Sequence, residues 1–89
     1  MENVISIVPE SVLYGKRLMI TFSTKEYRKG IFHPDSHFMV EHLKWTCKEW
    51  FDVEDNCIHS LGYGDADCKT YRMSVIIPEK MPKENQDGE

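Results

Sequence analysis

The sequence has no long apolar run. Val75-Ile76-Ile77 is among the longest, and it falls far below the roughly 18 to 20 apolar residues that span a bilayer. The start, Met1-Glu2-Asn3, lacks the basic charge and the apolar stretch of a secretory signal. We therefore expect an intracellular, cytoplasmic protein with no membrane contact.

Cysteines are few, and the motifs of several enzyme classes are missing. Three cysteines, an odd number, do not make a closed disulfide framework, and reduced thiols are expected. The sequence contains no Cys-x-x-Cys knuckle, no dinucleotide fingerprint and no EF-hand ligand ladder. No nucleophile, base and acid converge in so short a chain. We therefore expect a protein that is not an enzyme and has no cofactor.

Basic residues are outnumbered, with 11 Lys and Arg against 15 Asp and Glu and a net charge of −4. Residues 35–68 carry eight of the acids and two of the bases. Attraction to a phosphate backbone grows with the number of basic contacts, so nucleic acid is disfavoured as a partner. One local basic patch is an exception, and it comprises Lys25, Tyr27, Arg28 and Lys29. It is either a solvated turn or a nucleic-acid contact.

At 89 residues and 40% hydrophobic content, the chain is long enough for one small domain. The β-branched and alternating pattern of residues 4–22 predicts an antiparallel hairpin that turns at Tyr14-Gly15, with Pro9 at an edge or in a short turn. Ser23 and Glu26 have capping-box spacing, which predicts a short helix over 24–29.

A longer helix is predicted over residues 36–53, a segment without Gly or Pro. At about 100° per residue, one arc of this helix is apolar and forms the expected core face. That face comprises Met39, Val40, Leu43, Thr46, Cys47, Trp50 and Phe51. Lys48 and Asp52 fall on the opposite side at the spacing of an exposed ion pair.

The segment after this helix predicts a second hairpin, with strands at 57–61 and 70–77 around the turn Gly62-Tyr63-Gly64. The predicted fold is α+β, in ββαββ order, with a small four-stranded antiparallel sheet and one amphipathic helix packed on one face. We expect residues 1–77 to form the single domain and residues 78–89 to form a disordered polar tail.

A second stripe on the long helix lies away from its core arc and carries large aromatics. It comprises Phe38, His42, Trp45 and Glu49. Either it packs under other parts of the chain, or it contacts a partner, because Trp is enriched at interface hot spots. Tyr63, between two glycines, is expected to add an exposed aromatic to such a surface.

Cys57, His59 and Cys68 supply three ligand types that zinc prefers. If the second hairpin turns at Gly62–Gly64, they lie at nearby points on two strands. The fourth ligand would come from a set that includes Cys47, His33, His37, His42, Asp65 and Asp67. The alternatives are unliganded thiols or a Cys57–Cys68 disulfide.

These features favour a small non-enzymatic binding or regulatory protein, an inhibitor or accessory subunit acting through protein contacts. One alternative is a zinc-stabilised Cys/His domain that contacts nucleic acid, and another is a protein that sequesters a small ligand. Pairing of the edge strand Val4–Val8 into a homodimer is also open.

Overall fold

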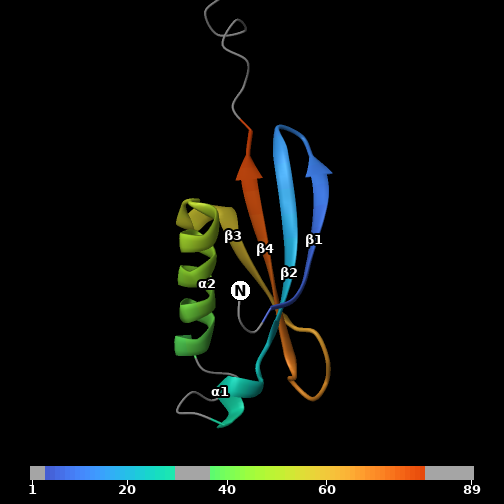
Figure 1. Ribbon diagram of the computed structural model, residues 1–89, viewed down its shortest axis with the longest axis vertical. Coiled ribbons are helices and arrows are strands. Elements are labelled where there is room, and N and C mark those ends of the chain that lie inside the picture. The colour runs from blue at the N-terminus through green and yellow to red at the C-terminus, as the bar shows by residue number, and fades with distance from the viewer. Residues whose placement is uncertain (1–3, 30–36, 80–89) are drawn as a thin grey trace, which may run out of the picture.

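The computed structural model describes residues 4–29 and 37–79, and the predicted α+β fold is confirmed (Figure 1). The strands and helices are β1 (Val4–Val12), β2 (Gly15–Ser23), α1 (Lys25–Lys29), α2 (His37–Phe51), a 3₁₀ turn η1 (Asp55–Cys57), β3 (Ile58–Tyr63) and β4 (Thr70–Pro78). The tail predicted over 78–89 lies outside the described residues from position 80 onward.

The four strands form one antiparallel sheet in the order β1-β2-β4-β3. β1 with β2 and β3 with β4 are hairpins of neighbouring strands, and β2 with β4 joins them. In the central pair, Leu18 faces Val75, Ile20 faces Met73 and Phe22 faces Tyr71. All six side chains are buried on the same face of the sheet. α2 packs on this face, against β3 and β4 (Figure 1).

The buried stripe of α2 is Met39, Leu43 and Cys47, which recur every four residues as an amphipathic helix requires. Phe22 of β2 stacks on Trp50 with ring centroids 6.1 Å apart. The other predicted core positions are partly buried: Val40, Thr46, Trp50 and Phe51. The core face predicted for this helix is therefore confirmed.

The C-terminal end of α2 differs from the prediction, because the helix ends at Phe51. Asp52 adopts a left-handed backbone with φ of 53°, a conformation common just beyond a helix end. Asp52 therefore lies beyond the helix, and its side chain is not held next to Lys48 as the predicted helical spacing required. The Lys48 amine pairs with Asp55 instead, at 3.6 Å.

The first hairpin turns at Leu13 and Tyr14, one residue earlier than predicted, and Val12 pairs with Gly15. Gly15 is required there, since a Cβ would lie 2.5 Å from the backbone oxygen of Ile77. Hydrogen-bonded and non-hydrogen-bonded pairs alternate along an antiparallel ladder. Because Val12 and Gly15 close the hairpin as a hydrogen-bonded pair, Pro9 falls at a non-hydrogen-bonded position and its nitrogen points away from β2. Pro9 thus lies on the free edge of β1, as predicted, without interrupting the ladder.

Replacing Tyr14 with glycine should raise the free energy of unfolding by about 0.5–1 kcal/mol. Tyr14 has φ of 60°, a left-handed conformation that costs a side chain energy and costs glycine little. The measurement is urea denaturation. Leu13→Gly is the control, because its φ is not positive, so it should lose stability. A loss in both variants would contradict the prediction.

Thr24 ties the end of β2 to the loop over residues 64–69. Its side chain is fully buried, its hydroxyl donates to the carbonyl of Cys68, and its N–H donates to Lys69 O at 2.9 Å. The predicted short helix follows as α1, where Ser23 Oγ accepts the N–H of Lys25 at 3.3 Å. The junction between β2 and α1 is thereby fixed against the start of β4.

Candidate functional site: an exposed aromatic stripe on α2

The outward face of α2 carries aromatic side chains in contact with solvent. Phe38 is 69% exposed and Trp45 is 55% exposed, and His42 and Glu49 are exposed as well. We call these four residues the aromatic stripe. Its exposure follows from the helix geometry, since Met39, Leu43 and Cys47 turn the opposite side of α2 onto the sheet. Of the two sequence-based readings, burial under other parts of the chain is wrong for Phe38 and Trp45.

Rings within and beneath the stripe pack on one another. His42 stacks on Trp45, with centroids 6.4 Å apart and ring planes 27° apart. On its other side His42 meets Tyr27 of α1 at 6.0 Å. Tyr27 is buried, and this burial, followed by the charge of Glu26, raises the pKa of its phenol. These contacts restrict the Trp45 side chain before any partner binds, so binding costs less side-chain conformational entropy.

Acidic groups surround the exposed ring of Trp45. A hollow of about 400 Å³ opens beside it, lined by Trp45, Lys48, Glu49, Asp52, Val53 and Glu54. Both lysines of α2 are paired within the chain, Lys44 with Glu41 at 3.9 Å and Lys48 with Asp55. Residues 37–55 contain five acidic and two basic side chains. The stripe is thus an aromatic surface in a negative field.

Tyr63 does not join this surface. It is the last residue of β3 and is half-buried. Its ring meets Tyr71 edge-on, with centroids 5.2 Å apart. The predicted exposed loop is absent at this position, because β3 continues through Gly62, which adopts φ of 112° at a bulge opposite β4.

The proposed zinc ligands Cys57, His59 and Cys68 are not brought together. Ile58 pairs with Val75 and Tyr63 with Tyr71, so Cys57 and Cys68 lie at opposite ends of the second hairpin. His59 faces the side of the sheet away from α2, opposite Ser74. Among residues 4–29 and 37–79, no three His, Cys, Asp or Glu side chains are grouped to hold a metal ion. All three cysteines are free, so the disulfide alternative is absent as well.

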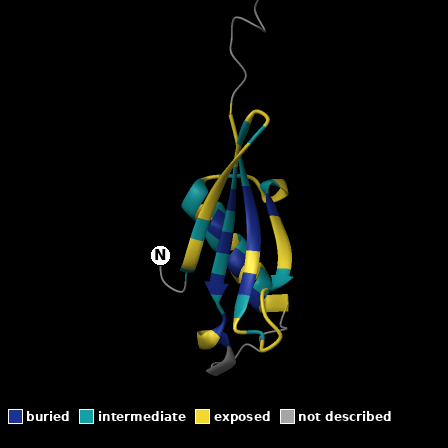
Figure 2. Cartoon of the chain, turned by 90° about the vertical axis from the view of Figure 1, so that its right-hand side faces the viewer, coloured by how far each residue is buried: buried dark blue, intermediate teal, exposed yellow. Residues whose placement is uncertain are grey.

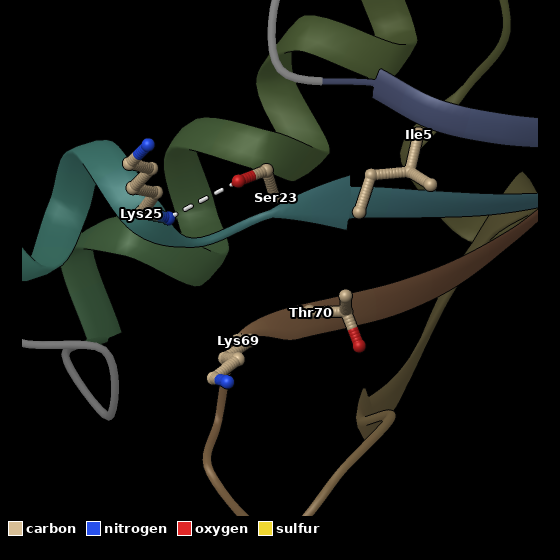
Figure 3. A pocket seen from close by; sticks show the side chains of 5 residues that line it. All are labelled: Ile5, Ser23, Lys25, Lys69 and Thr70. Atoms are coloured by element: carbon tan, nitrogen blue, oxygen red, sulfur yellow. Dashed lines mark hydrogen bonds between the residues drawn. The ribbon is translucent and has the colours of Figure 1, made fainter.

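The predicted basic patch is divided. Tyr27 is buried against His42, and the side chains of Arg28 and Lys29 lie outside the described residues. Lys25 lines a hollow of about 440 Å³ together with a different lysine, Lys69 (Figure 3). The lining residues are Ile5, Ser23, Lys25, Lys69 and Thr70. Lys69 already pairs with Asp67 at 3.5 Å, so one of the two positive charges is partly compensated.

Within the described ranges, no helix has both the length and the apolar character needed to cross a membrane. In comparisons with protein-family models, curated proteins and solved structures, the chain matched none.

Proposed function

We propose that the protein is a non-enzymatic binding protein, a regulator or accessory subunit, that recognises a protein partner through the aromatic stripe. The observation that carries this proposal is the exposure of Phe38 and Trp45 on one helix face. Large aromatics exposed together are costly in solvent and enriched at interface hot spots.

The chemistry around the stripe defines the partner. An amphipathic helix face binds a groove by placing its apolar anchors in it. Phe38 and Trp45 are such anchors, two turns apart on α2. Glu49, Asp52 and Glu54 lie around the hollow beside Trp45, so a complementary groove carries Lys or Arg at that end.

The alternative function, sequestering a small ligand, has less structural support than partner binding. The hollow between Lys25 and Lys69 is the feature that would serve it (Figure 3). Ile5 and Thr70 line it beside Ser23 and the two lysines. Ser23 Oγ already accepts the N–H of Lys25, and Lys69 is paired with Asp67. A charged metabolite would therefore meet few groups able to fix its orientation.

Replacing Trp45 with alanine should abolish partner binding and leave the fold intact. Loss of a hot-spot Trp costs 2 kcal/mol or more, which is a rise in Kd of about 30-fold or more. Since the side chain is exposed, the free energy of unfolding should change by less than about 0.5 kcal/mol. The partner is first captured with the wild-type chain, and its Kd is then measured by titration with each variant.

Leu13→Ala is the matched control, because Leu13 is an exposed apolar residue in the first hairpin turn. It should bind the partner as the wild type does. Equal affinity of Trp45→Ala and wild type would refute the proposal. Cooperative unfolding of Trp45→Ala would assign the ring to the core.

A further inference from the structure

The sheet has a second face, and α2 does not cover it. Next to the buried pairs, Arg17 pairs with Ile76, Met19 with Ser74 and Thr21 with Arg72, and these side chains point to the other side. We call this side the open face. It includes Ser6, Val8, Glu10, Arg17, Met19, Thr21, His59, Leu61, Arg72, Ser74 and Ile76. No helix among the described residues packs on it (Figure 2).

The middle of the open face carries four apolar side chains, Val8, Met19, Leu61 and Ile76, among polar ones. Val8 is 56% exposed and Leu61 is 48% exposed, at its two outer strands. Met19 and Ile76 lie between them and are half-buried. A hollow of about 430 Å³ crosses from β1 to β3 among these residues. One-sided antiparallel sheets carry polar residues on the outside, so an apolar group at the middle of the outer side indicates a contact with a further layer.

Two of the three charged groups of the open face, Arg17 and Glu10, pair with each other, and the third, Arg72, is exposed beside Thr21 toward the end of the face. Arg17 holds Glu10 through two hydrogen bonds, from Nη2 to Oε2 at 3.0 Å and from Nε to Oε1 at 3.3 Å. Two parallel bonds of this kind fix both side chains. Burying this pair leaves neither of its two charges unpaired. A surface that fits the middle of the open face is therefore apolar there, with Arg72 at the rim of the contact, where charged groups stay in water.

The open face of a second copy is a surface of this kind, because it carries the same apolar side chains at its middle. Two copies joined through their acidic helix faces would repel each other. Joined through their open faces, they place the two α2 helices on the outside, with both sheets between the acidic surfaces. The contact is then self-complementary, as a two-fold interface must be.

The area reaches the size of a specific interface when the two sheets pack along whole strands, and the β1 edge of the sheet is a poorer route. Four strands about 4.8 Å apart, with up to nine residues of about 3.3 Å each, present about 500 Å². Two such faces bury about 1,000 Å², the lower limit of a specific interface. Pairing through the free edge of β1 would instead meet Pro9, which has no N–H to donate.

We infer that two copies of the chain associate through their open faces, forming a dimer with the layers helix, sheet, sheet, helix. This contact is separate from the aromatic stripe, so the dimer leaves both stripes available to partners.

Sedimentation equilibrium of the reduced full chain, from micromolar to millimolar concentration, tests this inference. The wild-type mass should rise with concentration from 10.5 kDa to twice that value. The double variant Val8→Glu with Leu61→Glu should weaken the dimer by about 100-fold or more, because like charges would face each other at the contact. Leu13→Glu is the control outside the open face and should remain dimeric.

A second measurement uses only the wild-type chain, so it does not depend on the folding of a variant. A soluble paramagnetic probe should reach the methyl groups of Val8, Leu61 and Ile76 in dilute samples and lose access to them in concentrated ones. The methyl groups of Leu13 should stay accessible throughout.

Three results would overturn the inference. One is a monomer at millimolar concentration, including a monomer whose open face is shielded by another segment of the same chain. The second is a dimer that the double glutamate variant does not weaken. The third is shielding confined to other methyl groups. Trp45→Ala should remain dimeric, so failure of this inference is distinguishable from failure of the partner-binding proposal.

Discussion

Replacing Phe22 with alanine should lower the free energy of unfolding by about 3–5 kcal/mol. Phe22 is 1% exposed, pairs with Tyr71 across the centre of the sheet and stacks on Trp50 of α2. Its removal leaves a cavity where the two layers of the domain meet. At about 0.05–0.15 kcal/mol per residue, a chain of this length has a total free energy of unfolding of about 4–13 kcal/mol, so the variant should lose a large share of its stability.

Urea denaturation followed by circular dichroism measures this loss. Leu13→Ala should change the stability by less than about 0.5 kcal/mol, because Leu13 is 83% exposed. Phe22→Leu should retain part of the packing and fall between the two. A loss below about 1 kcal/mol in Phe22→Ala would contradict the packing of α2 on this face.

The stability of the fold should decrease steeply above pH 9 because of Cys47. Burial raises the pKa of this thiol from 9.0 to about 11. Below pH 9 the thiol is protonated in both the folded and the unfolded chain, so it contributes no pH dependence. Between pH 9 and 11 the unfolded chain releases the proton while the folded chain keeps it. The free energy of unfolding should therefore fall by up to about 1.4 kcal/mol per pH unit, and by roughly 3 kcal/mol in total.

Cys47→Ala isolates this effect. The alanine variant is less stable at every pH because it leaves a cavity, but its stability should fall less steeply between pH 9 and 10. Above pH 10 the raised pKa of Tyr27 adds to the slope of both proteins, so the comparison is made below that pH. Equal slopes would show that the Cys47 thiol ionises in the folded chain.

The sequence was sufficient for the elements whose signals are local. α2 was predicted because its apolar spacing and its freedom from Gly and Pro act within one segment. The first hairpin was predicted for the same reason. The second hairpin was misplaced at its turn, because Gly62-Tyr63-Gly64 resembles a turn in isolation. The pairing of Tyr63 with Tyr71 continues β3 through the bulge, and this tertiary contact is not visible in the local pattern.

The candidate site, too, was predictable from the sequence only where the signal is local. The helical wheel placed Phe38 and Trp45 on one side of α2, but whether another element covers that side depends on the tertiary packing. The proposed zinc ligands lie apart because their grouping required a turn at Gly62–Gly64, whereas β3 pairs with β4 as far as Tyr63. The open face was missed altogether, although a signal existed: Val8, Met19 and Ile76 are apolar at outward positions of three strands. They become neighbours only through the register.

The strand order sets the sequence in which the sheet assembles. Each hairpin closes a short loop, which costs little chain entropy and takes place on the microsecond scale. The central pair β2 and β4 joins residues more than half of the chain apart, so its closure is slower and depends on both hairpins. Until that step, Ile20, Phe22, Met73 and Val75 remain accessible to water and to other chains. The nascent protein is therefore most prone to misassociation after both hairpins exist and before they meet.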